Sequence, residues 1–218
     1  LNFTILNLFN KKGKTDYFYL VKAILENDKN VDINSRITKE SFKYSNEGIK
    51  SEKTILHGAI KKGNYENVQL LVENKDIDIN KKSLTPKFNI EVTPLYEAIQ
   101  NGNVKCVQCL LDHKNIDVNL KSSQGREQLT PLYSAVINNY IDIVRILINR
   151  NDISINLKSI QYEEDCDECT LEYYREISPL YLAVQYDRYD IVKLLLENKE
   201  VDVNNIANIK IDQYRTFT

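Results

Sequence analysis

The chain has 218 residues, 42% of them hydrophobic, and a formal net charge of -2 with acidic and basic side chains interspersed. This balance predicts neither a nucleic-acid-binding stripe nor a face attracted to membranes, and no apolar run approaches the ~20 residues that span a bilayer. Leu1–Phe9 lacks the basic flank and the small-residue cleavage site of a signal peptide, so we expect a cytoplasmic protein.

The first predicted elements are two helices, from the apolar stretch Ile5–Phe9 and from Val21–Asn27, followed by an extended tail, Val31–Asn34. This order recurs more clearly in four later segments of 27 residues each: repeat 1 (54–80), repeat 2 (93–119), repeat 3 (130–156) and repeat 4 (178–204). A terminal repeat has one face without a neighbour, which explains why residues 1–34 form a degenerate copy.

The first helix of each repeat is predicted to begin after a Thr or Ser, at Thr54, Thr93, Thr130 and Ser178. A hydroxyl at this place caps the helix, and in three repeats the Pro that follows has its φ preset for the first turn. In repeat 2 the apolar residues Leu95, Ala98 and Ile99 follow helical spacing, so one stripe of the helix should be buried.

A tight turn should then separate the first helix from the second. The turn position holds only residue types that tolerate positive φ: Gly63, Gly102, Asn139 and Asp187. The second helix is apolar on one face, most fully at Ile191–Leu196, and every repeat closes on an Asn after alternating apolar residues. Asn74 and Asn198 are candidates for a left-handed cap at the end of this helix.

Thr-Pro-Leu-Tyr-x-Ala at the front of a helix–turn–helix unit resembles the ankyrin repeat, whose signature is Thr-Pro-Leu-His-x-Ala. His57 occupies the His position in repeat 1, whereas Tyr96, Tyr133 and Tyr181 depart from it. The resemblance implies an all-α solenoid with long hairpin or loop connectors, which we expect to form one monomeric domain over residues 1–218. Residues 205–218 then form a connector to a further repeat, and the chain, which contains no Met, is expected to be an excerpt of a longer array.

Two Cys-x-x-Cys pairs, Cys106 with Cys109 and Cys166 with Cys169, have the spacing of a zinc site. In the repeat alignment Cys109 takes the position of Leu70, Ile146 and Leu194, so the first pair is better explained as core. Cys166 and Cys169 lie in a connector, where a local disulfide or redox pair is the alternative. We therefore expect no metal and no cofactor.

No pattern in the chain specifies a catalytic site. Gly13-Lys14-Thr15 lacks the earlier Gly of a phosphate-binding loop, because Leu8 stands in its place. His57 and His113, the only histidines, have no sequence partners that would complete a triad. We expect a chain that is not an enzyme.

A partner-binding surface is expected where the repeats differ from one another. In ankyrin-like stacks the first helices and connector hairpins line the concave side, so the variable first-helix positions are the contact candidates. This first-helix row contains Lys61, Lys62, Glu97, Gln100, Asn101, Ser134, Ile137, Asn138, Leu182, Gln185 and Tyr186. Its apolar end, with Ile137, Leu182 and Tyr186, is the expected anchor. The alternative is that Ile137 and Leu182 pack against a neighbouring repeat.

The connector from Leu157 to Ile177 is long and acidic, and it carries Tyr173 and Tyr174. Such a finger could meet a basic partner, with tyrosines supplying contact area. The alternative is a solvated insertion that contacts nothing.

Three function hypotheses follow. The leading one is a non-catalytic protein–protein interaction scaffold that binds another protein, neither nucleic acid nor membrane. The second is a regulatory or targeting segment of a larger enzyme of kinase or ubiquitin-system type, and the third is a metal-binding redox module.

Overall fold

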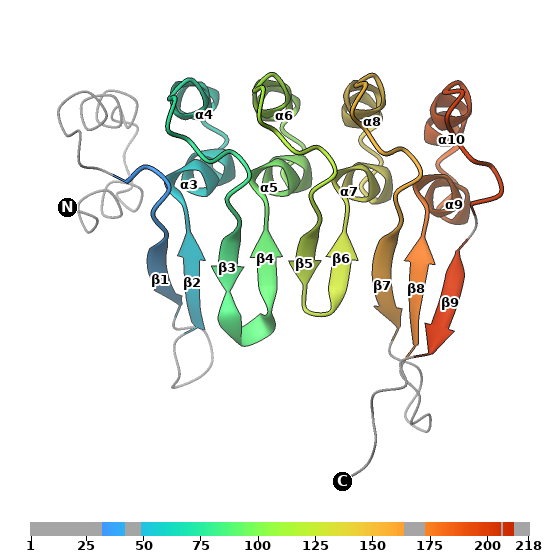
Figure 1. Cartoon of the computed structure of the whole chain (residues 1–218), viewed down its shortest axis with the longest axis horizontal. Coiled ribbons are helices and arrows are strands. Elements are labelled where there is room, and N and C mark those ends of the chain that lie inside the picture. The colour runs from blue at the N-terminus through green and yellow to red at the C-terminus, as the bar shows by residue number, and fades with distance from the viewer. Residues whose placement is uncertain (1–31, 42–48, 164–172, 206, 212–218) are drawn as a thin grey trace, which may run out of the picture. The chain divides into compact units, whose positions relative to one another are not determined.

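A computed structural model describes residues 32–41, 49–163, 173–205 and 207–211 (Figure 1). The described residues up to Ile116 form one compact unit, and those from Asp117 onward form a second. The predicted helices Ile5–Phe9 and Val21–Asn27, the Gly13-Lys14-Thr15 segment, Cys166, Cys169 and the acidic run before Tyr173 lie outside the described residues. The prediction of one domain over the whole chain stays a prediction.

The first unit contains two helix–turn–helix repeats and two hairpins. Its helices are α3 (Ile55–Lys62), α4 (Tyr65–Val72), α5 (Pro94–Gln100) and α6 (Val104–Leu111). Its strands are β1 (Ile37–Ser41), β2 (Ile49–Lys53), β3 (Ser83–Thr85) and β4 (Ile90–Val92), and a 3₁₀ turn, η1 (Pro86–Phe88), joins the last two. The first helices, α3 and α5, lie between the hairpins and the second helices (Figure 1).

The second unit has the same construction. Its helices are α7 (Pro131–Ile137), α8 (Ile141–Ile148), α9 (Pro179–Gln185) and α10 (Tyr189–Leu196). Its strands are β5 (Ser122–Gln124), β6 (Glu127–Leu129), β7 (Ser159–Glu163), β8 (Tyr173–Ile177) and β9 (Asn208–Ile211). The predicted solenoid of helix–turn–helix repeats is therefore present in the structure.

The expectation of a purely α fold is wrong, because the connectors form antiparallel β-hairpins. Consecutive hairpins also pair with each other, through Glu52 opposite Leu84 in the first unit and Gln128 opposite Ile160 in the second. An extended connector carries backbone N–H and C=O groups that need partners when shielded from water, and the neighbouring strand supplies them. The connectors thus position side chains on a sheet rather than on loose loops.

The predicted helix starts are confirmed. The side-chain oxygens of Thr54, Thr93, Thr130 and Ser178 each accept a hydrogen bond from the backbone N–H three residues later. The four tight-turn residues all have positive φ: 66° at Gly63, 63° at Gly102, 58° at Asn139 and 53° at Asp187. Because glycine has no Cβ, and Asn and Asp tolerate the left-handed region better than most residues, these residue types specify the turn locally.

The predicted left-handed caps at Asn74 and Asn198 are wrong. Neither has a positive φ. Instead the Asn74 Oδ1 accepts from the backbone N–H of Asp76 at 2.9 Å, and the Asn198 Oδ1 accepts from that of Glu200 at 2.9 Å. A side chain that bonds the backbone two residues on stabilises a turn without left-handed geometry, so no glycine is needed there.

A closing Asn clamps the tail of the repeat that follows it, as seen at Asn34, Asn80, Asn119 and Asn156. In the second unit the Asn156 Nδ2 donates to the Glu200 carbonyl at 2.7 Å, while its Oδ1 accepts from the backbone N–H of Asp202 at 2.9 Å. Asn34 makes the same pair of bonds with Asp76 and Asp78 in the first unit, at 2.7 and 2.6 Å. Asn34 therefore makes the same clamp as Asn156, and the degenerate copy to which it was assigned stays a prediction.

Candidate interaction surface

The first unit holds five residues of the first-helix row. Lys61 and Lys62 are exposed in the last turn of α3, where positive charge complements the helix dipole. The others already have partners: the Lys53 Nζ lies 3.2 Å from a Glu97 carboxylate oxygen, the Gln100 Nε2 donates to the Tyr96 hydroxyl, and the Asn101 Nδ2 donates to the Ile60 carbonyl. These three side chains therefore contribute to the scaffold, although Gln100 and Asn101, like Lys61 and Lys62, are exposed to a partner.

The second unit corrects two members of the row. Ser134 and Leu182 are fully buried, so the expectation that they contact a partner is wrong. These two residues and Glu97 follow the Tyr of the Thr/Ser-Pro-Leu-Tyr motif in their repeats. Glu97 is half-buried, whereas Ser134 and Leu182 enter the core, which accounts for the Leu in repeat 4. Ile137 and Asn138 are half-buried, while Gln185 and Tyr186 are exposed at the end of α9.

An aromatic and basic cluster, Arg126, Tyr162 and Tyr174, lies on neighbouring hairpins of the second unit. Tyr162 and Tyr174 are opposite each other in the β7–β8 register, and their ring centroids lie 5.4 Å apart with a tilt of 33°. The Arg126 Cζ lies 5.6 Å from the ring centroid of Tyr162, within cation–π range. Arg126 is exposed and both tyrosines are half-buried, so the cluster is accessible to a partner.

Of the three residues in this cluster, Tyr174 is a predicted site residue, whereas Arg126 and Tyr162 are not among the predicted contacts. The predicted Tyr173 lies in β8 opposite Glu163 on one side and Ile211 on the other. Arg126 follows Gly125, whose φ of 64° marks the β5–β6 turn, and a glycine there was the available signal for a hairpin. The strand register that brings Arg126 near Tyr162 is not visible in the repeat alignment.

His57 is a structural residue of the first unit. Its ring is fully buried, with Nδ1 2.8 Å from the Thr54 Oγ1 and Nε2 2.8 Å from the Val92 carbonyl. Because the carbonyl can only accept, Nε2 carries the proton and Nδ1 accepts from the Thr54 hydroxyl. Desolvation by burial lowers the pKa of His57 to about 4, against the upward effects of the Val92 carbonyl and the nearby Glu97 carboxylate. A neutral imidazole held on both nitrogens links α3 to β4 and is closed to substrates.

Cys106 and Cys109 sit on α6, as the alignment predicts. Cys106 is fully buried and Cys109 is half-buried, and both thiols are free. Desolvation by burial raises the pKa of Cys106, and the Glu66 carboxylate adds a smaller upward effect. Desolvation also raises the pKa of Cys109 to about 11, with smaller upward effects from Cys106, Asp112 and Glu73. Within the described ranges no three His, Cys, Asp or Glu side chains are arranged to hold a metal ion.

The raised pKa of Cys109 predicts that its thiol is alkylated slowly. With Cys166→Ser and Cys169→Ser introduced, iodoacetamide at pH 8 should alkylate Cys109 about a hundredfold more slowly than a thiol of pKa 9.0, because its thiolate is about a hundredfold rarer. Intact mass against time measures the rate, and the same protein in guanidinium chloride provides the exposed-thiol reference. Equal rates in the native and unfolded protein would contradict the assignment of Cys109 to the packed face of α6.

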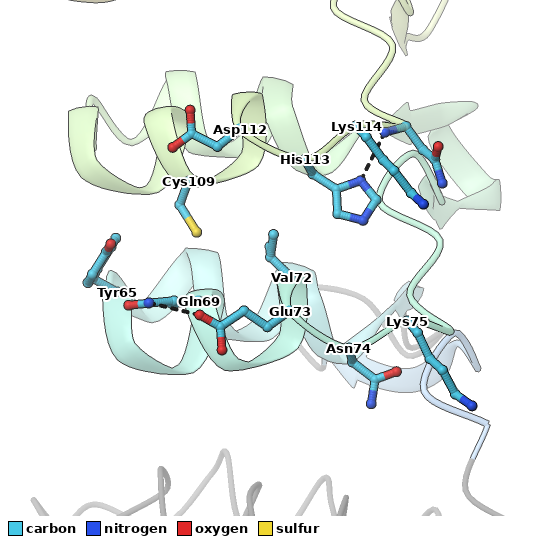
Figure 2. A pocket seen from close by; sticks show the side chains of 11 residues that line it. Tyr65, Gln69, Val72, Glu73, Asn74, Lys75, Cys109, Asp112, His113 and Lys114 are labelled. Carbon is cyan, nitrogen blue, oxygen red and sulfur yellow. Dashed lines mark hydrogen bonds between the residues drawn. The ribbon is translucent and has the colours of Figure 1, made fainter.

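A pocket of about 590 Å³ opens between α4 and α6, the second helices of the first unit (Figure 2). Side chains along its wall already make hydrogen bonds: the Gln69 amide donates to the Glu73 carboxylate at 2.9 Å, and the His113 Nδ1 accepts from the backbone N–H of Asn115 at 3.2 Å. Cys109 points into the pocket in Figure 2 as a protonated thiol. The pocket is lined by side chains of both charges, among them Glu73, Lys75 and Asp112, and it forms a groove between the second helices of neighbouring repeats.

Comparison with protein-family models agrees with the helix–turn–helix repeats seen in the structure. A family model described as ankyrin repeats in three copies matches residues 82–159, and a model of the single ankyrin repeat matches residues 51–84 and 176–209. The comparison with curated proteins returns no match. No helix in the part of the chain that the structure describes is long and apolar enough to span a membrane.

Proposed function

This chain belongs to the ankyrin repeat family, whose models match more than half of its residues, and we propose that it is a non-catalytic scaffold that binds a partner protein through its first helices and connector hairpins. Members of this family generally mediate protein–protein interaction. What we propose for this chain is that it binds a partner protein, which face it uses, and which residues anchor the contact.

The observation that carries this proposal is the cluster of Arg126, Tyr162 and Tyr174. Tyrosine and arginine are the residue types that dominate interface energies, because they combine a large contact area with few rotatable bonds or a planar set of donors. Cross-strand pairing of the two tyrosines orders their rings before binding, so less side-chain entropy is lost on association. The exposed guanidinium of Arg126 favours a partner that presents a carboxylate beside an apolar side chain.

A second contact area is proposed from the accessible members of the first-helix row. Tyr186 exposes 40% of its surface beside Gln185 in the second unit, and Lys61 with Lys62 is exposed in the first. Charge at exposed rims such as Lys61 and Lys62 mainly affects the rate of encounter, whereas the tyrosines supply buried contact. A scaffold also suits the chemistry available here, because His57 is neutral and enclosed and the two described thiols are protonated.

The proposal is tested with the full chain as bait for an extract of the organism that encodes it, followed by calorimetry with the captured protein. Tyr162→Ala with Tyr174→Ala should weaken binding at least about tenfold, because two anchors are lost. Tyr189→Ala is the matched control: Tyr189 is the most exposed large hydrophobic residue described, at 77%, but it lies on a second helix.

Two results would contradict the proposed surface. One is a captured protein whose affinity changes equally in the Tyr189→Ala control and in the hairpin variant. The other is an affinity that none of Tyr162→Ala, Tyr174→Ala or Tyr186→Ala changes. Unchanged far-ultraviolet circular dichroism and an unchanged unfolding midpoint for each variant exclude loss of fold as the cause.

A further inference from the structure

The turn between α5 and α6 contains the only Asn–Gly dipeptide in the sequence, Asn101-Gly102. Asn is one of the chemically labile residues of proteins. Before a Gly it is open to attack on its side-chain carbonyl carbon by the next backbone nitrogen, because Gly has no Cβ to hinder the approach. Asn101 is exposed, so water reaches its side chain. This turn therefore carries the groups needed for a covalent change of Asn101.

The reaction converts the Asn101 amide to a carboxylate in two steps. In the first step a bond forms between the Gly102 nitrogen and the Asn101 Cγ, the Cγ–Nδ2 bond breaks, and the amide group leaves as ammonia with the proton of the Gly102 nitrogen. The product is a succinimide ring. Water then opens one of the two carbonyl bonds to the ring nitrogen, which yields Asp or an isoaspartate whose main chain runs through Cγ. The net reaction consumes water, releases ammonia and needs no oxidant.

The folded turn holds both reacting groups in hydrogen bonds. The Gly102 N–H donates to the Ile99 carbonyl at 2.8 Å, at the end of α5. The Asn101 Nδ2 donates to the Ile60 carbonyl at 3.3 Å, which holds the amide on α3. The backbone of Asn101 is right-handed, with φ of -80° and ψ of -5°, and Gly102 follows with a φ of 63°. Attack requires both hydrogen bonds to break, and therefore a local opening of the turn.

The Asn101 amide also joins two repeats. Ile60 lies in α3 of repeat 1, Asn101 caps α5 of repeat 2, and these two helices pack on each other. A carboxylate at position 101 cannot donate to the Ile60 carbonyl, and it adds negative charge beside the negative end of the α3 dipole. Isoaspartate in addition lengthens the main chain of the turn by one carbon atom. Either product should weaken the contact between repeats 1 and 2.

We propose that Asn101-Gly102 is a deamidation site that the fold keeps closed, and that conversion of Asn101 loosens α5 from α3. Conversion takes place when the turn opens, and the product opens more readily than the parent because it lacks the bond to Ile60. Conversion also places a carboxylate in the first-helix row. The inference goes beyond the scaffold function and does not depend on a partner, because it concerns the coupling of repeats 1 and 2.

The rate of conversion in the full chain tests the closed site. The folded protein and the same protein in guanidinium chloride are incubated at pH 8, and peptide mapping with isoaspartate detection follows position 101. Conversion in the folded protein should be at least about tenfold slower, because the turn must open first. The matched control is Gly102→Asn, since repeat 3 has Asn139 with a φ of 58° at this turn position. In guanidinium chloride this variant should convert Asn101 more slowly than the parent, because a side chain now hinders the attack.

Measurements on Asn101→Asp, one of the two products, test the consequence. Its unfolding midpoint should fall by about 3 °C or more, and hydrogen exchange should accelerate in α3 and α5 more than in α7 and α9. Equal conversion rates in the folded and unfolded parent, or in the unfolded parent and unfolded Gly102→Asn, would overturn the closed site. If exchange in α3 and α5 were the same in Asn101→Asp as in the parent, the amide would not couple the two repeats, and that part of the proposal would be overturned.

Discussion

Acidification from pH 7 to pH 4 is expected to reduce the free energy of unfolding by about 3 kcal/mol through His57 alone. The pKa of this imidazole falls from 6.5 to about 4 on folding, chiefly because burial disfavours the charged form. The unfolded chain therefore binds a proton that the folded chain resists. The stabilisation is complete above pH 6.5, is lost as the pH falls from 6.5 towards 4, and does not change further below 4.

Urea unfolding at several values between pH 7 and pH 4 measures this effect. Carboxylates also titrate in this range, so the comparison is with His57→Tyr, the residue type that repeats 2, 3 and 4 carry at Tyr96, Tyr133 and Tyr181. The pH dependence of the variant should be shallower than that of the parent by about 3 kcal/mol across the window. If the free energy of unfolding had the same pH dependence in both proteins, folding would not lower the pKa of His57. The description of His57 as a buried, neutral imidazole would then be wrong.

Asn156→Ala should lower the free energy of unfolding by about 2 kcal/mol, because two hydrogen bonds at about 1 kcal/mol each are lost. These bonds join the end of repeat 3 to the tail of repeat 4, so the exchange of amides in α9 and α10 should accelerate more than that in α7 and α8. Chemical denaturation gives the total loss, and hydrogen exchange gives its location.

Asn204→Ala is the control that the chain itself supplies. Asn204 closes repeat 4 as Asn156 closes repeat 3, but its side-chain amide has no partner in the described part of the chain, so its loss should change stability by less than about 0.5 kcal/mol. Similar losses from both substitutions would indicate that the Asn acts through its own turn and not through the clamp. No loss from Asn156→Ala would indicate that water replaces both bonds.

Local features of the fold were predictable from sequence, and features that depend on distant backbone were not. The helix caps and the left-handed turns at Asn139 and Asp187 follow from one residue and its immediate neighbours. The predicted left-handed caps at Asn74 and Asn198 were wrong because an Asn at the end of a helix can either adopt positive φ or accept a hydrogen bond from the backbone two residues on, and the residue type does not distinguish the two. Hairpins were expected as one form of the connectors, but the pairing of consecutive hairpins into a sheet was not, because it joins strands of connectors that differ in length.

The candidate surface was only partly accessible to the same reasoning. Of the row selected by variation between repeats, Lys61, Lys62, Gln100, Asn101, Gln185 and Tyr186 are exposed, and their contact with a partner stays a prediction. The selection fails at Ser134 and Leu182, because a position can vary among Glu, Ser and Leu when the neighbouring packing changes from repeat to repeat. The cluster around Tyr162 depends on strand register, which the sequence of one hairpin does not fix when its loop is long.

The Asn clamps have a mechanical consequence. Each described clamp joins a repeat to its immediate neighbour, as does the packing of consecutive helices, so within a unit the interfaces between repeats lie in series. A series arrangement under tension opens first at its weakest interface while the others stay closed. A closing residue such as Asn156 therefore contributes to the strength of one interface, and the weakest interface sets the force at which a unit begins to extend.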